Sequence, residues 1–162
     1  MALPKIHTIG YEGASIEDLV ASLRFSSVTR LIDARQSPYS RRPEFSKDEL
    51  SATLADYGIA YTHIRELGNP PAGREAAHTG HKAVFREIFN AHLDGPDGQK
   101  GLALALTFAA YETVCLLCLE KSHLNCHRSM VADRLNAMSG QEIVHLRVET
   151  RQPHPAQAAF DF

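Results

Sequence analysis

The chain has 162 residues, of which 44% are hydrophobic and 22% are charged, and its formal net charge is −2. This composition fits one compact domain with a full core and argues against a broad basic surface for nucleic acid, although it leaves room for a local basic patch. No run of about 18 apolar residues exists, so we expect no membrane span, and no secretory signal is visible. The three cysteines are an odd number and lie close together. They do not look like a disulfide scaffold, and we expect a cytoplasmic protein with reduced thiols.

Short β-branched runs alternate with amphipathic segments along the chain. The runs predict five strands, over residues 5–10, 28–34, 59–64, 113–119 and 142–146. The amphipathic segments predict helices over residues 16–24, 46–57, 81–93 and 101–110, and from 126 to a glycine at 140. Residues 94–98 are expected to end the third of these helices and to separate it from the fourth.

Three helix starts carry capping signals. Ser15 with Asp18, and Ser46 with Glu49, form capping-box patterns. Asn125 is the expected N-cap of the last long helix.

The alternation predicts an α/β fold: a single domain over residues 1–146 with a largely parallel five-stranded sheet and helices on both faces, in a Rossmann-like arrangement. Residues 147–162 are expected to form an irregular C-terminal tail. If the sheet is doubly wound, its first and fourth strands flank the switch point, where ligands bind outside the carboxyl ends of the strands. The turn at 10–13 and the stretch 120–128 then face one crevice, bordered by residues 33–42.

Two loops carry groups suited to ligand binding. Asp33, Arg35, Ser37 and Arg41 follow the second strand, and guanidinium and hydroxyl groups suit phosphate or carboxylate recognition. The alternative is that the arginines are solvated and that Asp33 pairs with Arg35. Residues 65–80 form the longest irregular stretch, which predicts either a binding loop that presents Arg65, Arg74 and His78 or a poorly formed helix over residues 74–78.

The densest chemistry lies at the start of the last long helix, at Cys126, His127 and Arg128. N–H groups of the first turn and the helix dipole favour negative charge, so a thiol there ionises more easily. Arg128 is a candidate anion clamp. The alternative is that Cys126 only packs while His127 and Arg128 cap carboxylates. The loop of cysteine phosphatases does not match, because the arginine follows the cysteine by only two residues.

Glu120 leaves the fourth strand just before this helix. In an extended strand it shares a face with Leu116 and Cys118, whereas Cys115 points the other way. Glu120 is a candidate general base, and the alternative is that it neutralises an arginine.

A metal site is the main rival interpretation. Five residues resemble a ligand set: Cys115, Cys118, His123, Cys126 and His127. Because strand parity separates Cys115 from Cys118, we expect no metal and no other cofactor. A redox pair of Cys118 with Cys126 is also compatible with the sequence.

The motifs together resemble the domain of unknown function family 488. They are Gly10-Tyr11, Asp33-x-Arg35 with Ser37, and Cys118-x-Glu120 followed by Cys126-His127-Arg128, and the resemblance extends over residues 5–146. It implies a small α/β domain with these motifs at its site.

We expect an enzyme, with a hydrolase or transferase favoured, that binds a small phosphate- or nucleotide-like anion at the carboxyl edge of the sheet. The candidate catalytic residues are Cys126, Glu120 and His127. The candidate ligand-binding residues are Gly10, Tyr11, Asp33, Arg35, Ser37, Arg41, Cys118 and Arg128. The alternatives are a non-catalytic module that binds a nucleotide or nucleic-acid end and, third, a structural zinc protein. We expect no membrane partner, and a homo-oligomer is compatible with the sequence.

Overall fold

The protein is built around one five-stranded parallel sheet, which the computed structural model shows for a chain described over residues 2–149. The strands are β1 (Ile6–Gly10), β2 (Arg30–Asp33), β3 (Ala60–His63), β4 (Val114–Cys118) and β5 (Ile143–His145). Their order across the sheet is β3-β2-β4-β1-β5, and all four pairings are parallel. The predicted α/β fold is therefore confirmed. Of the irregular tail predicted over residues 147–162, residues 147–149 contain no helix or strand, and residues 150–162 lie outside the described part of the chain.

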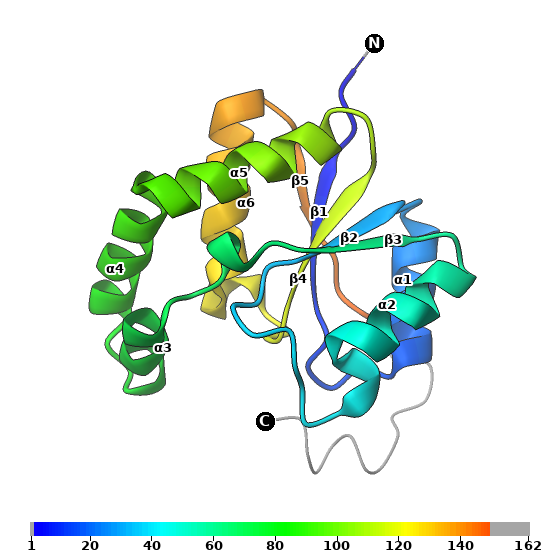
Figure 1. The fold of residues 1–162 in the computed structure, drawn as a ribbon, viewed down its shortest axis with the longest axis horizontal. Helices are drawn as coiled ribbons and strands as arrows, with labels where there is room; N and C mark the ends of the chain where they lie inside the picture. Colours follow the sequence, from blue (N-terminus) through cyan, green and yellow to red (C-terminus); the bar gives the residue numbers. More distant parts are fainter. Residues whose placement is uncertain (1, 150–162) are drawn as a thin grey trace.

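Residues 2–149 contain six α-helices. They are α1 (Ile16–Phe25), α2 (Lys47–Asp56), α3 (Pro71–His78), α4 (Lys82–Asp94), α5 (Pro96–Ala109) and α6 (His127–Ser139). Of these, α1 and α2 pack on one face of the sheet, α5 and α6 pack on the other, and α3 and α4 project to one side (Figure 1). Short 3-10 turns lie at η1 (Pro43–Phe45), η2 (Arg65–Leu67) and η3 (His123–Asn125). Within residues 2–149, no helix has the length and apolar character needed to cross a bilayer.

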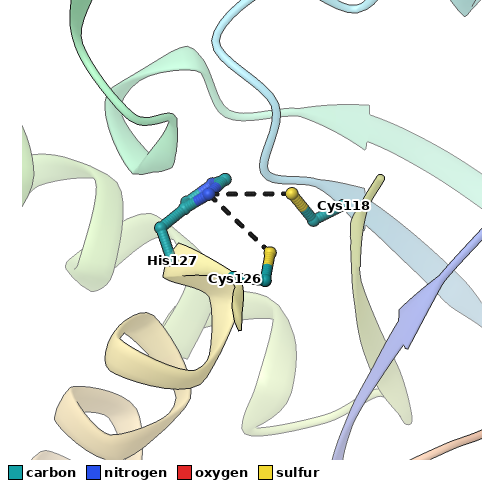
Figure 2. Close-up of side chains that lie close together, drawn as sticks. All are labelled: Cys118, Cys126 and His127. Atoms are coloured by element: carbon teal, nitrogen blue, oxygen red, sulfur yellow. Dashed lines mark hydrogen bonds between the residues drawn. The ribbon is translucent and has the colours of Figure 1, made fainter. Parts of the chain in front are cut away.

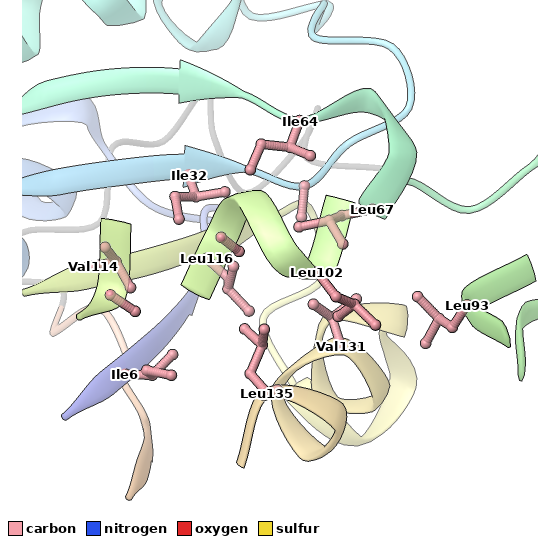
Figure 3. Close-up of a cluster of buried hydrophobic side chains, with 14 of the residues drawn as sticks. Ile6, Ile32, Ile64, Leu67, Leu93, Leu102, Val114, Leu116, Val131 and Leu135 are labelled. Carbon is pink, nitrogen blue, oxygen red and sulfur yellow. The ribbon is translucent and has the colours of Figure 1, made fainter. Parts of the chain in front are cut away.

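Two hydrophobic clusters, one on each face, hold the helices against the sheet. Ile32 and Leu116 point to the face covered by α5 and α6, where Leu102 and Leu135 pack on them (Figure 3). Leu31, Cys115 and Leu117 point to the other face, which α1 and α2 cover. The sheet is thus buried on both sides, as parallel sheets require. The alternation also confirms that Cys115 and Leu116 lie on opposite faces.

The chain changes direction around β4. It leaves β1 and β2 for α1 and α2 on one face, and it leaves β4 for α6 on the other. The first and fourth strands are neighbours, as predicted, and β2 borders β4 on its other side. A crevice therefore opens at the carboxyl end of β4, between the ends of β1 and β2.

Two of the three predicted N-caps are correct in position, and one of these two makes the cap hydrogen bond. Ser15 Oγ accepts the Asp18 N–H at 3.0 Å. Ser46 is the N-cap of α2, but its hydroxyl makes no cap hydrogen bond and accepts the Ser40 N–H instead. The predicted N-cap of α6 at Asn125 is wrong, because η3 ends at Asn125 and Cys126 is the N-cap.

Residues 65–80 are more regular than a binding loop. They contain η2 and then α3, which begins with Pro71, a residue whose fixed φ suits the first helical position. The predicted break at residues 94–98 is also shorter than expected, because α5 begins at Pro96 rather than at 101. Gly98 permits this tight corner, since a Cβ there would lie 2.2 Å from the His92 carbonyl oxygen.

Candidate functional site

A pocket of about 400 Å³ lies at the carboxyl edge of the sheet, where parallel register brings Gly10 level with Cys118 and Asp33 level with Leu117. Its lining residues come from the ends of β1, β2 and β4 and from α3 and α6. They are Tyr11, Arg35, Gln36, Ser37, Tyr39, Asn69, Arg74, Ala77, His78, Cys118, Leu119, Glu120 and His127. The predicted crevice therefore contains a pocket large enough for a small molecule.

The end of β1 lies directly against the chain that leaves β4. A Cβ on Gly10 would come within 1.8 Å of the Glu120 carbonyl oxygen, so only glycine fits there. That carbonyl also accepts a 2.5 Å hydrogen bond from Arg128 Nη1. Gly10 thus positions Glu120, and it does not line the pocket.

Arg128 also binds the segment that follows β4, at Glu120 and Lys121. Its side chain is completely buried, and its guanidinium donates to Thr8 Oγ1 and to the carbonyl oxygens of Glu120 and Lys121. These bonds attach the segment after β4 to the start of α6 and to β1. They do not support the predicted anion clamp, because the guanidinium faces protein groups and is not part of the pocket wall.

Asp33 and Arg35 form a buried pair, which is the alternative left open by the sequence. Arg35 donates from Nε and Nη2 to the two Asp33 oxygens at 2.8 and 2.7 Å. Tyr61 donates to Asp33 Oδ2 at 2.5 Å, and Tyr11 accepts from Arg35 Nη1 at 3.2 Å. Burial and the Asp33 carboxylate raise the pKa of Tyr61, which keeps it a donor. Asp33 is fully buried, whereas Arg35 reaches the pocket and keeps two of its five N–H groups beyond these side-chain bonds.

Cys118, Cys126 and His127 lie close together (Figure 2), and two of them, Cys118 and His127, line the pocket. Cys118 ends β4, while Cys126 and His127 begin α6. His127 Nδ1 lies 3.6 Å from Cys118 Sγ and 3.8 Å from Cys126 Sγ. His127 Nε2 lies 2.8 Å from the Ala34 carbonyl oxygen, and a carbonyl only accepts, so Nε2 carries a hydrogen and Nδ1 points to both sulfurs.

The two thiols differ in their ionisation. Burial acts against ionisation of Cys126, but the hydrogen bond from Cys118 and the positive charges of His127 and Arg128 outweigh it and lower the pKa of Cys126. The pKa of Cys118 is raised by its bond to Cys126, by burial and by nearby Glu120. The Arg128 N–H, 3.5 Å from Cys126 Sγ, favours the same assignment. The expected easy ionisation at the helix start thus has a physical basis in this geometry.

His127 and Glu120 complete the cluster of titratable groups. Burial opposes the charged form of His127, but the neighbouring Cys126 raises its pKa. Burial, followed by the influence of Cys126, raises the pKa of Glu120 to about 7. Glu120 Oε2 lies 3.2 Å from Cys118 Sγ, so the carboxyl group stands beside the sulfur that lines the pocket.

Cys126 itself is 4% exposed and is not among the residues that line the pocket. Cys118 has the same small exposure but forms part of the pocket wall. The role of Cys126 as the nucleophile therefore stays a prediction, and the geometry places Cys118 nearer to a ligand.

Helix α3 and the residue before its start supply a second part of the pocket wall. Arg74 and His78 line the pocket, as the binding-loop interpretation of their segment expected, although they do so from a helix. Asn69, just before this helix, was not among the predicted site residues. Its Oδ1 is buried without a hydrogen-bond partner in the described part of the chain, and it lies where a Cβ on Gly73 would be 2.1 Å away. The Asn-Pro-Pro sequence at a helix start was the available signal.

Other predicted residues lie elsewhere. Ser37 is exposed and lines the pocket, but Arg41 is exposed and lies outside it. Cys115 is fully buried on the α1–α2 face, and burial raises the pKa of its thiol. His123 stacks on His145 with ring centroids 3.7 Å apart, away from the cysteine cluster. Neither Cys115 nor His123 belongs to the group around His127.

Comparison with known proteins adds the family. A family model described as "Domain of unknown function DUF488" matches residues 15–135, a range that contains Cys118, Glu120, Cys126, His127 and Arg128 but not Gly10 or Tyr11. No curated protein and no solved structure gives a significant match to the chain. Since the family model covers most of the sequence, the chain belongs to the DUF488 family.

Proposed function

We propose that this protein is an enzyme that hydrolyses a small anionic ligand, or transfers a group from it, in the pocket at the carboxyl edge of the sheet. One observation carries the proposal: a single pocket has reactive groups on one wall and cationic or amide groups on the other. Cys118, Glu120 and His127 lie on the first wall. Arg74 and Asn69 lie on the second.

The second wall suits a ligand with negative charge. Arg74 is exposed on α3, and Arg35 keeps two N–H donors for a ligand after pairing with Asp33. Asn69 adds a buried amide whose Oδ1 is an acceptor without a partner within residues 2–149, so it suits a hydroxyl or amine donor of the same ligand and not its negative charge. A buried amide of this kind gains most from a ligand that completes its hydrogen bonds. A phosphate or carboxylate ester of metabolite size fits the volume and these donors.

The first wall suits proton transfer and nucleophilic attack. Glu120 lies at the pocket beside the Cys118 sulfur, so its carboxyl group is placed to take a proton from an attacking group and return it to a leaving group. His127 is held in one orientation by the Ala34 carbonyl. These two groups come from a strand end and a helix start, both fixed by the sheet.

Ligand binding is tested by a thermal-shift screen of phosphate esters, nucleotides and small carboxylates. A ligand at about 100 times its dissociation constant should stabilise the fold by about 2.7 kcal/mol. Arg74→Ala should lose this response. Arg86→Ala is the matched control, because Arg86 is an exposed arginine on the neighbouring helix α4 and does not line the pocket.

Turnover of the compounds that bind decides between an enzyme and a binding module. We expect conversion by the wild type and, for Glu120→Gln, binding with a large loss of turnover. A ligand that binds without conversion by the wild type would contradict the enzyme proposal and support the non-catalytic module. Salt-sensitive binding to nucleotide ends would point to the same alternative.

A further inference from the structure

We infer that Cys118, Cys126 and His127 bind a Zn²⁺ ion, with a fourth coordination position that is open to the pocket and holds a water molecule. The sequence alone favours no metal, because Cys115 and Cys118 point to opposite faces of the sheet. The structure brings together three of the five residues that resemble a ligand set in the sequence and leaves Cys115 and His123 apart from them. The ligand atoms of these three residues lie within 4.8 Å of one another.

The separations match the geometry of bound zinc. With Zn–S bonds of about 2.3 Å and Zn–N bonds of about 2.0–2.1 Å, tetrahedral S and N ligands lie about 3.6 Å apart. His127 Nδ1 lies 3.6 Å from Cys118 Sγ and 3.8 Å from Cys126 Sγ. Both Nδ1–Sγ separations are therefore close to those of a zinc site, and Figure 2 shows the imidazole and the two sulfurs facing one another.

The groups behind the ligands also fit a metal site. A histidine that binds a metal usually donates its other ring N–H to a carbonyl or carboxylate, which orients the ring. His127 Nε2 makes this contact with the Ala34 carbonyl at 2.8 Å. The Arg128 backbone N–H points to Cys126 Sγ at 3.5 Å. Each contact holds one ligand side chain, His127 or Cys126, in its position.

The ligand types select zinc among common divalent ions. Thiolate sulfur and imidazole nitrogen suit Zn²⁺, whereas Mg²⁺ and Ca²⁺ prefer oxygen. Three protein ligands leave one position open, as in catalytic zinc sites, whereas structural sites use four. Glu120 is not part of the three-residue group, although its carboxylate lies 3.2 Å from Cys118 Sγ. Nucleobase deaminases combine the same parts, a histidine, two cysteines and a glutamate that does not bind the zinc.

The chemical role that we assign to the zinc ion, activation of a water molecule for attack on the ligand, rests on the proposed function. The zinc-bound water gives a proton to the Glu120 carboxylate, and the resulting hydroxide attacks the phosphorus or carbonyl carbon of the ligand. A new bond forms from the hydroxide oxygen to that atom, and the bond to the leaving group breaks. The leaving group takes its electron pair and the proton from Glu120, so the sum is addition of one water.

Metal content per chain tests the inference without any substrate. Wild-type protein, loaded with ZnCl₂ and dialysed against metal-free buffer, should retain about one zinc per chain by elemental analysis. Cys118→Ser, Cys126→Ser and His127→Gln should each lower zinc affinity by at least about 100-fold, beyond the loss of a supporting hydrogen bond alone. Serine at 126 still caps α6, and glutamine at 127 still has a donor for the Ala34 carbonyl, so circular dichroism should show folded variants.

Cys115→Ala is the matched control, because it removes a buried cysteine from the opposite face and should leave zinc binding unchanged. Glu120→Gln should keep the zinc while losing turnover. Absence of stoichiometric zinc from the loaded wild type, or equal retention by Cys126→Ser and Cys115→Ala, would overturn the inference. If zinc is absent but the protein converts a ligand and Cys126 is alkylated rapidly, the proposed function would stand, with a thiol as the nucleophile. Zinc retention without turnover of any ligand would instead remove the proposed function and leave the metal site.

Discussion

Replacement of Arg128 by methionine separates a structural role of this residue from ligand binding. Methionine keeps most of the buried volume but removes the charge and all side-chain donors. Three acceptors then lose their partner: Thr8 Oγ1 and the carbonyl oxygens of Glu120 and Lys121. None of the three gains water easily, because Arg128 is 0% exposed.

The expected cost follows from these contacts. A hydrogen bond with a charged partner contributes about 1.5–3 kcal/mol, and the three bonds are not additive because they share one group. Relief from burying the guanidinium offsets part of the loss. A buried acceptor left without a donor costs about 1–3 kcal/mol, so three of them, added less than fully, give an expected total of about 3–5 kcal/mol. This is a large part of the 5–15 kcal/mol that is typical for a domain.

Urea unfolding followed by circular dichroism measures the effect. Arg134→Met is the matched control on the same helix. Arg134 pairs with Asp94 at 2.6 Å, but the two side chains are 29% and 66% exposed, so its loss should cost less than about 1 kcal/mol. Equal stability of the two variants would refute the structural role of Arg128. Loss of ligand binding at full stability would restore it as an anion clamp.

Three further substitutions test other parts of the site. Gly10→Ala places a Cβ 1.8 Å from the Glu120 carbonyl oxygen, so it should lower the free energy of unfolding by roughly 1–3 kcal/mol and abolish ligand binding. Gly58→Ala, in open space at φ +73°, should lower it by about 1–2 kcal/mol and leave ligand binding intact. Thermal-shift curves with and without ligand measure both effects. Asp33→Asn leaves the Arg35 charge buried, so it should lower the free energy of unfolding in urea by about 3–5 kcal/mol. Glu112→Gln, in the more exposed pair with Arg30, should lower it by less than about 1 kcal/mol. Similar losses for the two variants would contradict the importance of burial. Burial, with the charges of His123 and Arg128, lowers the pKa of His145, so the unfolded chain takes up this proton first. The contribution of His145 to stability should therefore decrease as the pH drops below about 6.5 and stay constant above it. His145→Gln should reduce the fall in melting temperature at low pH. An unchanged slope would exclude His145 as the source of the fall.

The sheet was predictable from sequence because its signals are local. Each strand lies in a short run that is rich in apolar or β-branched residues, and alternation along β4 already placed Cys115 and Cys118 on opposite faces. The sequence also predicted that Cys118, Glu120 and the start of α6 meet at the carboxyl edge of the sheet. These inferences need only strand parity and the rule for parallel sheets.

Sequence offered the pairing of Asp33 with Arg35, but it did not predict the other partners of the buried charged groups, because they come from distant segments. Arg128 is bound by Thr8 of β1, and Asp33 is bound by Tyr61 of β3. Sequence shows that Arg128 stands at a helix start, where anions bind, but not that its side chain points into the protein. Helix α3 was ambiguous for a different reason, since its short, polar sequence lacks a strong apolar stripe and buries only Gly73 and Ala76.

The two walls of the pocket differ in how firmly the fold holds them. Cys118 and His127 belong to a strand and a helix that pack into the core, and Gly10 and Arg128 fix the segment between them. Arg74 lies on α3, whose small buried face contributes little to the core. Changes at Arg74 should therefore alter ligand preference with less than about 0.5 kcal/mol of destabilisation, whereas changes at Gly10 or Arg128 should remove stability and binding together. This division lets a rigid set of reactive groups accept different ligands through substitutions on one helix.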